Sequence, residues 1–492
     1  MVEIHNKQFL FAKAEVKNPF FEHWNTKKIG EYTLYSHANL SVALGKEQGD
    51  DRLLLLGNCY DYRYPDYSNQ QIADHLGSID SWHELLKEYS ETSGENVLLF
   101  TKGSQIFLAN DACSQMEVFY NQDVSLVASQ PKLMERIVPL EEVTDLIARK
   151  HFDSQVFKNK KTNIGIETQF IGINHLIGNH YLDFEQRSQK RFYPNQKLSR
   201  ISVAESAEKT KKILTGYLKS IANRSKVALP VTAGIDSRVI LTCALDANIK
   251  NLEFFTIKFP WMTDTHNDLV ISRMIAKRLN FQLDIYDIST TKPPVVPEFD
   301  ESLTLHNTQF DTSTIHVLKQ FGDRNVTVVD GSIIGVTKNF FGKLIRISGR
   351  NLARMAGYPN SEFAIRQFDR WLSKSKEIFD KHGFHTLDMF FWEDRASNWM
   401  LTVKTKFLLV SNYYSIFNSR ALFESMLMTK RKYRDAQDHK IFNYILENAQ
   451  HDLTNIPINP SIKKKIMLLG KKTGLYFLYR NIMIKLGILK FK

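Results

Sequence analysis

The chain has 492 residues, 43% hydrophobic and 24% charged; this composition is ordinary for globular proteins, and the length predicts at least two domains. The formal net charge is +12, but no nucleic-acid-binding motif accompanies it, which disfavours a nucleic-acid-binding protein. No apolar run reaches the ~20 residues of a membrane-spanning helix, which disfavours a membrane-spanning protein. The three cysteines, Cys59, Cys113 and Cys243, are too far apart in sequence for a disulfide framework or a zinc spacing.

Residues 1–195 are predicted to form a strand-rich domain. Short apolar runs at residues 53–56 and 97–100 are separated by turn residues, a pattern typical of β-strands. Residues 1–7 lack the basic, apolar and small-residue sections of a signal peptide. With the isolated cysteines, this start predicts a cytoplasmic protein.

A strand, a small-residue turn and a helix follow one another around residue 230. The apolar strand at 227–231 leads into Thr-Ala-Gly-Ile-Asp-Ser at residues 232–237, and an apolar helix pattern begins there. Small residues let backbone N–H groups converge on one point, and a helix N-terminus adds partial positive charge. This segment, the phosphate loop (residues 231–237), therefore predicts an anion site suited to a polyphosphate.

The next elements predict a parallel sheet around this loop. Residues 252–259 and 281–286 have the aromatic and β-branched composition of strands, and 267–279 has helical periodicity between them. Alternating strands and helices favour a doubly wound parallel sheet, an α/β fold. Ligands of such sheets bind beyond the carboxyl ends of the strands, which is where the phosphate loop falls.

The phosphate loop resembles the S-G-G-x-D-S pyrophosphate loop of the N-type ATP pyrophosphatases, and in particular the asparagine-synthetase-like amide ligases, with Thr232 and Ala233 in place of the first Ser and Gly. Residues 56–63 are similar to the N-G-E-I-Y-N-Y segment of class II glutamine amidotransferase domains. The resemblance implies a glutaminase-like α/β/β/α sandwich of the Ntn type over 1–195 and an ATP pyrophosphatase domain with an adenine-nucleotide-hydrolase-like sheet and an α-helical lobe over 200–460. Residues 461–492, in which lysines and arginines alternate with apolar residues, are predicted to form a basic amphipathic tail.

The chain departs from that family where glutamine would be hydrolysed. These amidotransferases attack glutamine with an N-terminal cysteine, whereas this chain begins Met-Val-Glu. Its first cysteine, Cys59, falls inside a predicted strand, and Leu56 replaces the asparagine that would hold glutamine. A buried thiol without a base is inert. Glutamine hydrolysis is therefore expected to be lost, with the amine supplied by a substrate or by ammonia.

A second departure affects the metal. The family carries a later loop, S-G-x-G-x-D-E, whose acids help to hold magnesium. Here Gly331 survives after the strand at 326–329, but Ile-Gly-Val at residues 334–336 stands where the acids are expected. Asp330 could reach the metal, as could Asp268 or Asp311, and the sequence does not choose among them.

The resemblance implies ATP and Mg²⁺ as cofactors. It assigns the catalytic roles to Asp236 and Arg238, of which Arg238 could equally be a solvated first-turn residue, and Mg²⁺ binding to Asp236 and Asp330. The residues expected to contact nucleotide are Thr232, Ala233, Gly234, Ile235, Asp236, Ser237, Ile257, Gly331 and Lys463. A substrate carboxylate would attack the α-phosphorus to give an acyl-adenylate and pyrophosphate, and an amine would complete the amide.

Three functions remain open at this point. The first is an amide ligase that acts on an unusual carboxylate, such as a sugar acid of a surface polysaccharide or a peptide side chain. The second is a catalytically inactive relative that serves as a scaffold, as the missing acids would allow. The third, a tRNA-thiolating enzyme, is disfavoured because no cysteine pair is placed to carry sulfur. The basic tail could lie on an anionic membrane, gather an acidic substrate, or dock as a terminal helix.

Overall fold

The computed structural model describes residues 3–45, 51–292, 296–306, 313–342, 346–435, 438–460, 475, 479 and 482–483. Within this part of the chain, no helix has the length and apolar character needed to cross a membrane. Lys463 and Asp311, like most of the basic tail, lie outside the described residues.

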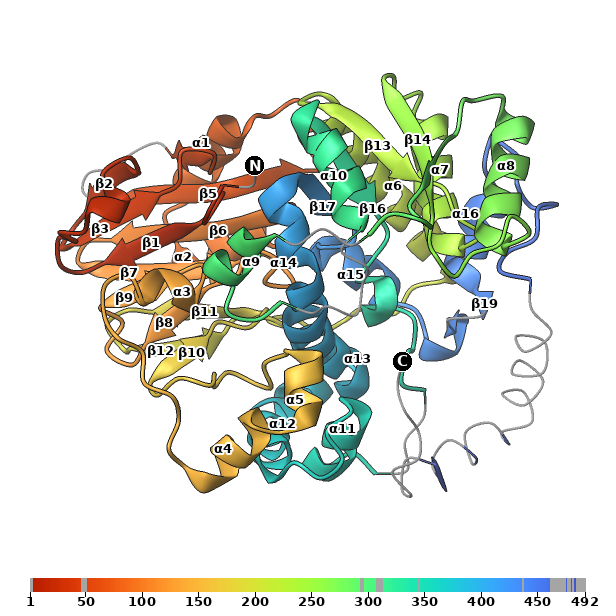
Figure 1. The fold of residues 1–492 in the computed structure, drawn as a ribbon. Helices are drawn as coiled ribbons and strands as arrows, with labels where there is room; N and C mark the ends of the chain where they lie inside the picture. Colours follow the sequence, from red (N-terminus) through yellow and green to blue (C-terminus); the bar gives the residue numbers. More distant parts are fainter. Residues whose placement is uncertain are drawn as a thin grey trace.

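Two six-stranded antiparallel sheets occupy the N-terminal part (red to yellow in Figure 1). The first has the order β10 (Ile173–His175), β8 (Phe119–Asn121), β9 (Leu126–Ala128), β1 (Phe9–Ala12), β3 (Tyr32–Ser36), β2 (Asn25–Ile29). The second has the order β12 (Ser188–Arg191), β11 (His180–Asp183), β7 (Gln105–Asn110), β6 (Thr92–Lys102), β5 (Arg52–Asp61), β4 (Val42–Leu44).

Strand β5 shows why these sheets pack in layers. Successive side chains of a strand point to opposite faces. Leu54 and Leu56 accordingly join a core cluster with Phe9 and Phe11 of β1, between the two sheets. Leu53 and its alternate neighbours instead pack against α1 (Asn69–Gly77) and α2 (Trp82–Tyr89) on the outer face. The four consecutive leucines are buried because both faces of the strand are covered.

A five-stranded parallel sheet forms the second part of the fold. Its order is β15 (Asp284–Asp287), β14 (Leu252–Lys258), β13 (Lys226–Pro230), β16 (Val326–Asp330), β17 (Asn412–Ser415). All four pairings are parallel, with Leu229 opposite Phe254 and Ala228 opposite Val328. The predicted α/β class, with a parallel sheet around residue 230, is therefore confirmed.

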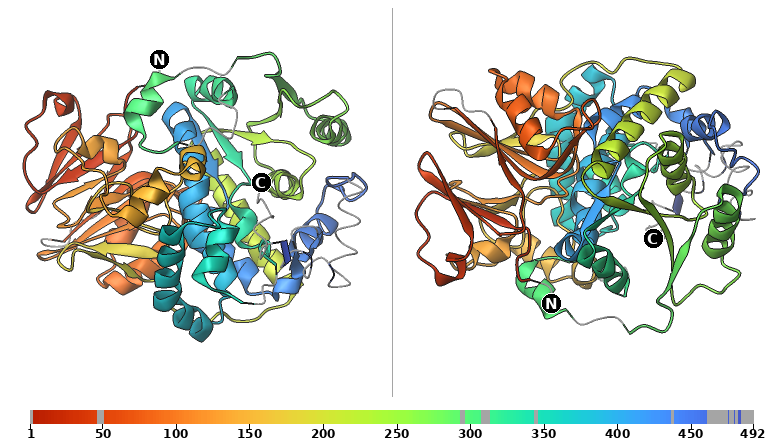
Figure 2. Two further views of the ribbon diagram at one scale, coloured as in Figure 1. Left: turned by 60° about the horizontal axis from the view of Figure 1, so that its bottom comes forward. Right: turned by 90° about the horizontal axis from the view of Figure 1, so that it is seen from above.

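Helices cover both faces of this sheet (Figures 1 and 2). On one face lie α6 (Val203–Ala222), α7 (Ile235–Asp246), α8 (Asn267–Leu279) and α16 (Lys440–Glu447). On the other lie α10 (Thr314–Asp323) and α14 (Met400–Val410). Strand β13 carries side chains to both clusters, Leu229 to the first and Ala228 to the second, so the sheet is buried on both sides.

A helical lobe packs below the parallel sheet in the view of Figure 1. It contains α4 (Leu146–Phe152), α5 (Gln155–Lys160), α11 (Gly349–Met355), α12 (Glu362–His382), α13 (Thr386–Phe390) and the π-helical η3 (Phe391–Trp399). The other described elements are η1 (Pro19–Phe21), α3 (Pro131–Met134), α9 (Pro297–Ser302), η2 (Ile334–Val336), α15 (Arg420–Leu427), η4 (Arg431–Tyr433), β18 (Arg434–Asp435) and β19 (Asp438–His439).

The two parts of the fold contact each other through buried polar bonds. The Ser93 hydroxyl of β6 lies 2.5 Å from the Tyr414 hydroxyl of β17 and donates to the Asn418 carbonyl at 2.6 Å. The division into domains at residues 195 and 460 stays a prediction.

Candidate functional site

The phosphate loop lies at the carboxyl end of β13, between that strand and α7. Gly234 is the N-cap of α7, with φ −73° and ψ 156°, and no described side chain caps the helix. The first N–H groups of a helix have no intrahelical partner. The amides of Ile235, Asp236 and Ser237 are therefore donors at the positive end of α7, an arrangement that suits an anion.

Hydroxyl groups fix the shape of this loop. The Thr232 and Ser237 hydroxyls lie 2.8 Å apart, and the Gly234 amide donates to Thr232 Oγ1 at 3.1 Å. None of the residues from 232 to 237 has a positive φ. Ala233 can therefore stand in place of glycine without backbone strain, since only a left-handed conformation would require glycine.

Neighbouring elements hold the loop from two sides. The Ala233 amide donates to Asp268 Oδ1 of α8 at 2.8 Å. The Ala233 carbonyl accepts from the Asn459 amide at 3.0 Å. The segment that follows α16 therefore crosses beside the phosphate loop, and both backbone groups of Ala233 already have protein partners.

Asp236 makes an ion pair beside these amides. Its Oδ2 lies 2.5 Å from Lys338 Nζ, and its Oδ1 is buried without a hydrogen-bond partner. Gly331 lies against it, because a Cβ added to this glycine would come within 3.1 Å of the Asp236 Cβ. The structure therefore brings Asp236 and Gly331 together, and it adds Lys338, which the sequence analysis missed. The sequence signal that could have identified Lys338 is its position two residues after 334–336, where the two expected acids are absent.

Arg238 lies elsewhere than the expected phosphate contact. Its guanidinium is buried and donates to the carbonyls of Leu453 at 3.3 Å, Ile456 at 2.5 Å and Pro457 at 2.9 Å. Burial lowers the pKa of Arg238 to about 10. Because these carbonyls precede Asn459, Arg238 positions the segment that crosses beside the loop.

We expect Arg238→Leu to lower the free energy of unfolding by roughly 3 kcal/mol, since it leaves three carbonyls without their charged donor. Urea denaturation measures this, with the exposed Arg273→Leu on α8 as the matched control. Equal midpoints for the two variants would contradict the positioning role.

Ile257 and Asp330 also differ from their expected surroundings. Ile257 is partly buried against the cluster on the α10 and α14 face. Asp330 bonds to four side chains: Lys404 at 3.1 Å, Tyr413 at 2.5 Å, Ser332 at 2.7 Å and Ser415 at 2.9 Å. Burial raises the pKa of Asp330, but the Lys404 charge and the hydroxyl donors outweigh it and hold that pKa below its ordinary value.

These residues do not fit the magnesium site that the resemblance implies. Both oxygens of Asp330 already have partners, and one oxygen of Asp236 faces Lys338. Residues 334–336 contribute no oxygen side chain, and within the described ranges no group of three or more His, Cys, Asp or Glu could hold a metal ion. Mg²⁺ at a phosphate site is usually held by one or two carboxylates together with waters and substrate phosphates, and here only Asp236 Oδ1, among the oxygens of Asp236 and Asp330, has no protein partner.

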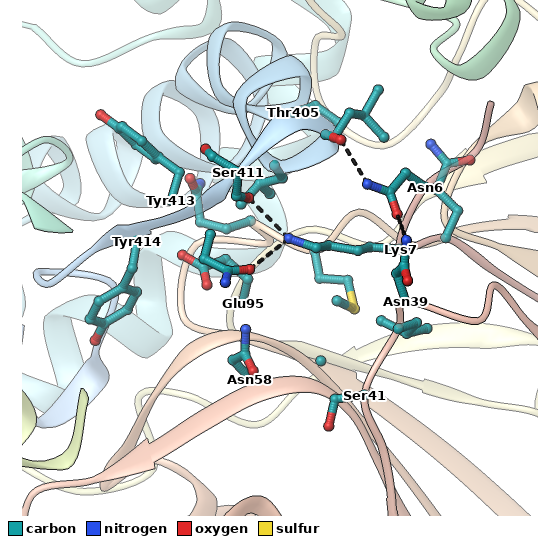
Figure 3. Close-up of a pocket in the computed structure, with 18 of the residues that line it drawn as sticks. Asn6, Lys7, Asn39, Ser41, Asn58, Glu95, Thr405, Ser411, Tyr413 and Tyr414 are labelled. Atoms are coloured by element: carbon teal, nitrogen blue, oxygen red, sulfur yellow. Dashed lines mark hydrogen bonds between the residues drawn. The ribbon is translucent and has the colours of Figure 1, made fainter. Parts of the chain in front are cut away.

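A cavity of about 260 Å³ lies between the antiparallel and parallel sheets (Figure 3). Lys7, two residues before the start of β1, crosses it and donates to the Ser411 carbonyl at 3.0 Å and to Asn412 Oδ1 at 2.8 Å. None of the described residues that line the cavity is a cysteine. Cys59 is buried in β5, and this burial raises its pKa to about 12. The cavity therefore offers amides, hydroxyls and charged groups, and no thiolate.

Two buried carboxyl groups face this cavity. Burial raises the pKa of Glu95 to about 8, with a further contribution from Asp111. Burial likewise raises the pKa of Glu117 to about 8, although Gln130 and Thr405 donate to its carboxylate. Burial lowers the pKa of Lys7 to about 8. Each of these groups is shifted towards its neutral form.

We expect Glu95→Gln to change how stability depends on pH. Between its ordinary value of 4.5 and about 8, the folded protein holds a proton on Glu95 that the unfolded chain has lost. The protonated Glu95 therefore makes its full contribution to the free energy of unfolding below pH 4.5, and that contribution is lost as the pH rises through 8. The stability of Glu95→Gln relative to the native sequence should rise by roughly 2–4 kcal/mol between pH 5 and 9. Thermal melts across this range measure it, with exposed Glu208→Gln as the control; parallel curves would overturn it.

Two solved structures resemble the chain distantly, at 12% identity. A scan against protein-family models and a search of curated proteins both found no match. A glutamine PRPP amidotransferase from B. subtilis, complexed with ADP and GMP, matches at 12% identity and a TM-score of 0.22, over 53% of this chain and 77% of that chain. A structure described as the allosteric regulatory enzyme of purine biosynthesis matches at 12% identity and a TM-score of 0.21, over 93% of each chain. Scores this low support no assignment.

Proposed function

We propose that the phosphate loop binds the polyphosphate of ATP and that the protein activates a substrate carboxylate for amide formation. The observation that carries this proposal is the uncapped N-terminus of α7 at the carboxyl end of β13, the central strand of the parallel sheet. Ligands of such sheets bind at this edge, and helix N-termini bind phosphate groups.

The chemistry that this proposal assigns is an acyl transfer through an adenylate. A carboxylate oxygen of the substrate bonds to the α-phosphorus, and pyrophosphate leaves. An amine then bonds to the acyl carbon, loses a proton and displaces AMP. The amides of Ile235, Asp236 and Ser237 would align the leaving polyphosphate and offset its charge, and such alignment and electrostatic stabilisation dominate phosphoryl chemistry.

The substrate classes follow from the same proposal. The carboxylate would belong to a small molecule or a peptide, and the amine would come from a second substrate or from ammonia, because the cavity beside β1 presents no cysteine to hydrolyse glutamine. Contact of the basic tail with a membrane surface and a cytoplasmic location stay predictions.

Calorimetric titration with ATP tests the proposal through Ile235→Pro. Proline at the first helical position is tolerated, and the backbone of Gly234 has the extended conformation that a following proline requires. The variant therefore keeps the helix while it removes one amide donor and fills its place. We expect the native chain to bind ATP and Ile235→Pro to lose at least about 10-fold in affinity, the worth of one hydrogen bond to a charged group.

Ile235→Ala is the matched control, since it shortens the same side chain and retains the amide. It should bind ATP nearly as tightly as the native chain. Equal affinities for the proline and alanine variants would show that nucleotide binds away from the loop.

A second candidate is a scaffold that binds a partner and no nucleotide. The observations that favour it are the Lys338 ion pair on Asp236 and the complete set of protein partners around Asp330. Absence of ATP binding by the native chain, with and without Mg²⁺, would favour this candidate over the ligase.

A further inference from the structure

The ion pair between Lys338 and Asp236 lies where a nucleotide site would carry a metal ion. Asp236 is the second residue of α7, so its carboxylate lies beside the proposed phosphate position. Two anions so close repel each other unless a cation lies between them. Lys338 Nζ is already 2.5 Å from Asp236 Oδ2, and its side chain is only 14% exposed.

The turn that carries Lys338 is held at both ends. Arg434 Nη1 donates to the Thr337 carbonyl at 2.8 Å, and Arg431 Nη2 donates to the Gly342 carbonyl at 3.2 Å. Asp388 pairs with both arginines, at 3.3 Å from Arg431 and 2.8 Å from Arg434. The buried Arg434 and the partly buried Arg431 therefore fix the backbone on either side of Lys338, so its ammonium group is placed before any ligand arrives.

Among the described residues, the other charged groups near the pair already have partners, which leaves Lys338 as the cation beside the loop. Arg238 donates to carbonyls of the segment 453–457, and Asp268 accepts from the Ala233 amide. His439, which also faces Lys338, is buried and has its pKa lowered well below 6.5, first by burial and then by Lys338 and Arg434. A neutral imidazole adds no positive charge to the site.

We propose that Lys338 is a built-in cation that replaces a magnesium ion on Asp236 and transfers to a phosphate oxygen when nucleotide binds, so that binding needs no divalent cation. This inference rests on the proposed function of the phosphate loop. It accounts for the residues 334–336, which carry no acids: a site with its own ammonium group does not need carboxylates to recruit a metal.

Titration of ATP in excess EDTA and in excess Mg²⁺ tests this inference. We expect the native chain to bind ATP in EDTA within about 3-fold of its affinity in Mg²⁺. Lys338→Gln should lose roughly 10- to 100-fold in EDTA, the range of a charged hydrogen bond. It should regain part of that loss in Mg²⁺, because the freed Asp236 can then bind the metal. Lys338→Arg should retain binding in EDTA.

Asp236→Asn gives a prediction of opposite sign for the two accounts of this residue. If Asp236 holds Lys338, its loss frees the ammonium for phosphate, and affinity in EDTA should stay the same or rise. If Asp236 instead anchors a metal ion, its loss should abolish the binding of ATP in Mg²⁺. Lys319→Gln and Asp323→Asn, from an exposed ion pair on α10, are the matched controls.

The outcomes separate this inference from the proposed function. Strict dependence of native binding on Mg²⁺, with Lys338→Gln unchanged, would overturn the role of Lys338 and leave the phosphate loop intact. No binding by the native chain in either condition would overturn the nucleotide site itself.

Discussion

Replacement of Arg191 by methionine is expected to lower the free energy of unfolding by about 3–5 kcal/mol, the cost of leaving one partner of a buried ion pair alone. Arg191, at the end of β12, pairs through both terminal nitrogens with Glu393 of η3, and the Nη2–Oε2 distance is 2.7 Å. The two side chains are 9% and 1% exposed. Trp371 and Asn179 also donate to Glu393, so without Arg191 the buried charge would keep only neutral donors.

Urea denaturation followed by circular dichroism measures this effect. Arg366→Met, from an exposed pair with Glu362 on α12, is the matched control and should change stability by less than about 0.5 kcal/mol. If Arg191→Met and Arg366→Met unfolded at the same urea concentration, the pair between Arg191 and Glu393 would contribute little to stability. Because Arg191 joins the antiparallel sheets to the helical lobe, its loss should also weaken the contact between these two parts.

Asp388→Asn should lower the free energy of unfolding by roughly 3 kcal/mol and also weaken ligand binding. Its carboxylate is buried between Arg431 and Arg434. Burial raises the pKa of Asp388, but these two arginines outweigh it and hold the pKa below its ordinary value. The amide would leave two neighbouring guanidinium groups without a counter-charge.

The readout for Asp388 includes ligand binding as well as stability. Because Arg431 and Arg434 hold the turn that carries Lys338, Asp388→Asn should weaken ATP binding in EDTA although it lies away from the loop. Asp380→Asn, which removes an exposed partner of Lys376, is the matched control. A destabilised variant with native affinity would show that Lys338 does not depend on this anchor.

Local sequence patterns predicted much of the parallel sheet. Helix α8 begins and ends at the predicted residues, 267 and 279, and β14 was expected one residue longer than observed. The strand expected at 281–286 begins later, at Asp284. Phe281 is apolar because its ring packs against Phe254, with centroids 4.1 Å apart, and it does not belong to the strand. The apolar character of Phe281 therefore made the predicted strand begin three residues too early.

The candidate site was harder to predict because its contacts are between distant residues. In α7, all residues from Arg238 to Ala244 are buried, so no polar face indicated which way the Arg238 side chain points. The sequence left Arg238 either at phosphate or in solvent, whereas its buried side chain binds carbonyls more than 200 positions away. Lys338 and Asp236 are likewise 102 positions apart. Periodicity and turn chemistry contain no information on such pairs.

A crystal structure with a non-hydrolysable ATP analogue tests the central claim most directly. We predict that the β- and γ-phosphates lie against the amides of Ile235, Asp236 and Ser237, with Lys338 Nζ moved from Asp236 to a phosphate oxygen. An analogue bound elsewhere, with the loop empty and Lys338 still paired with Asp236, would contradict the claim.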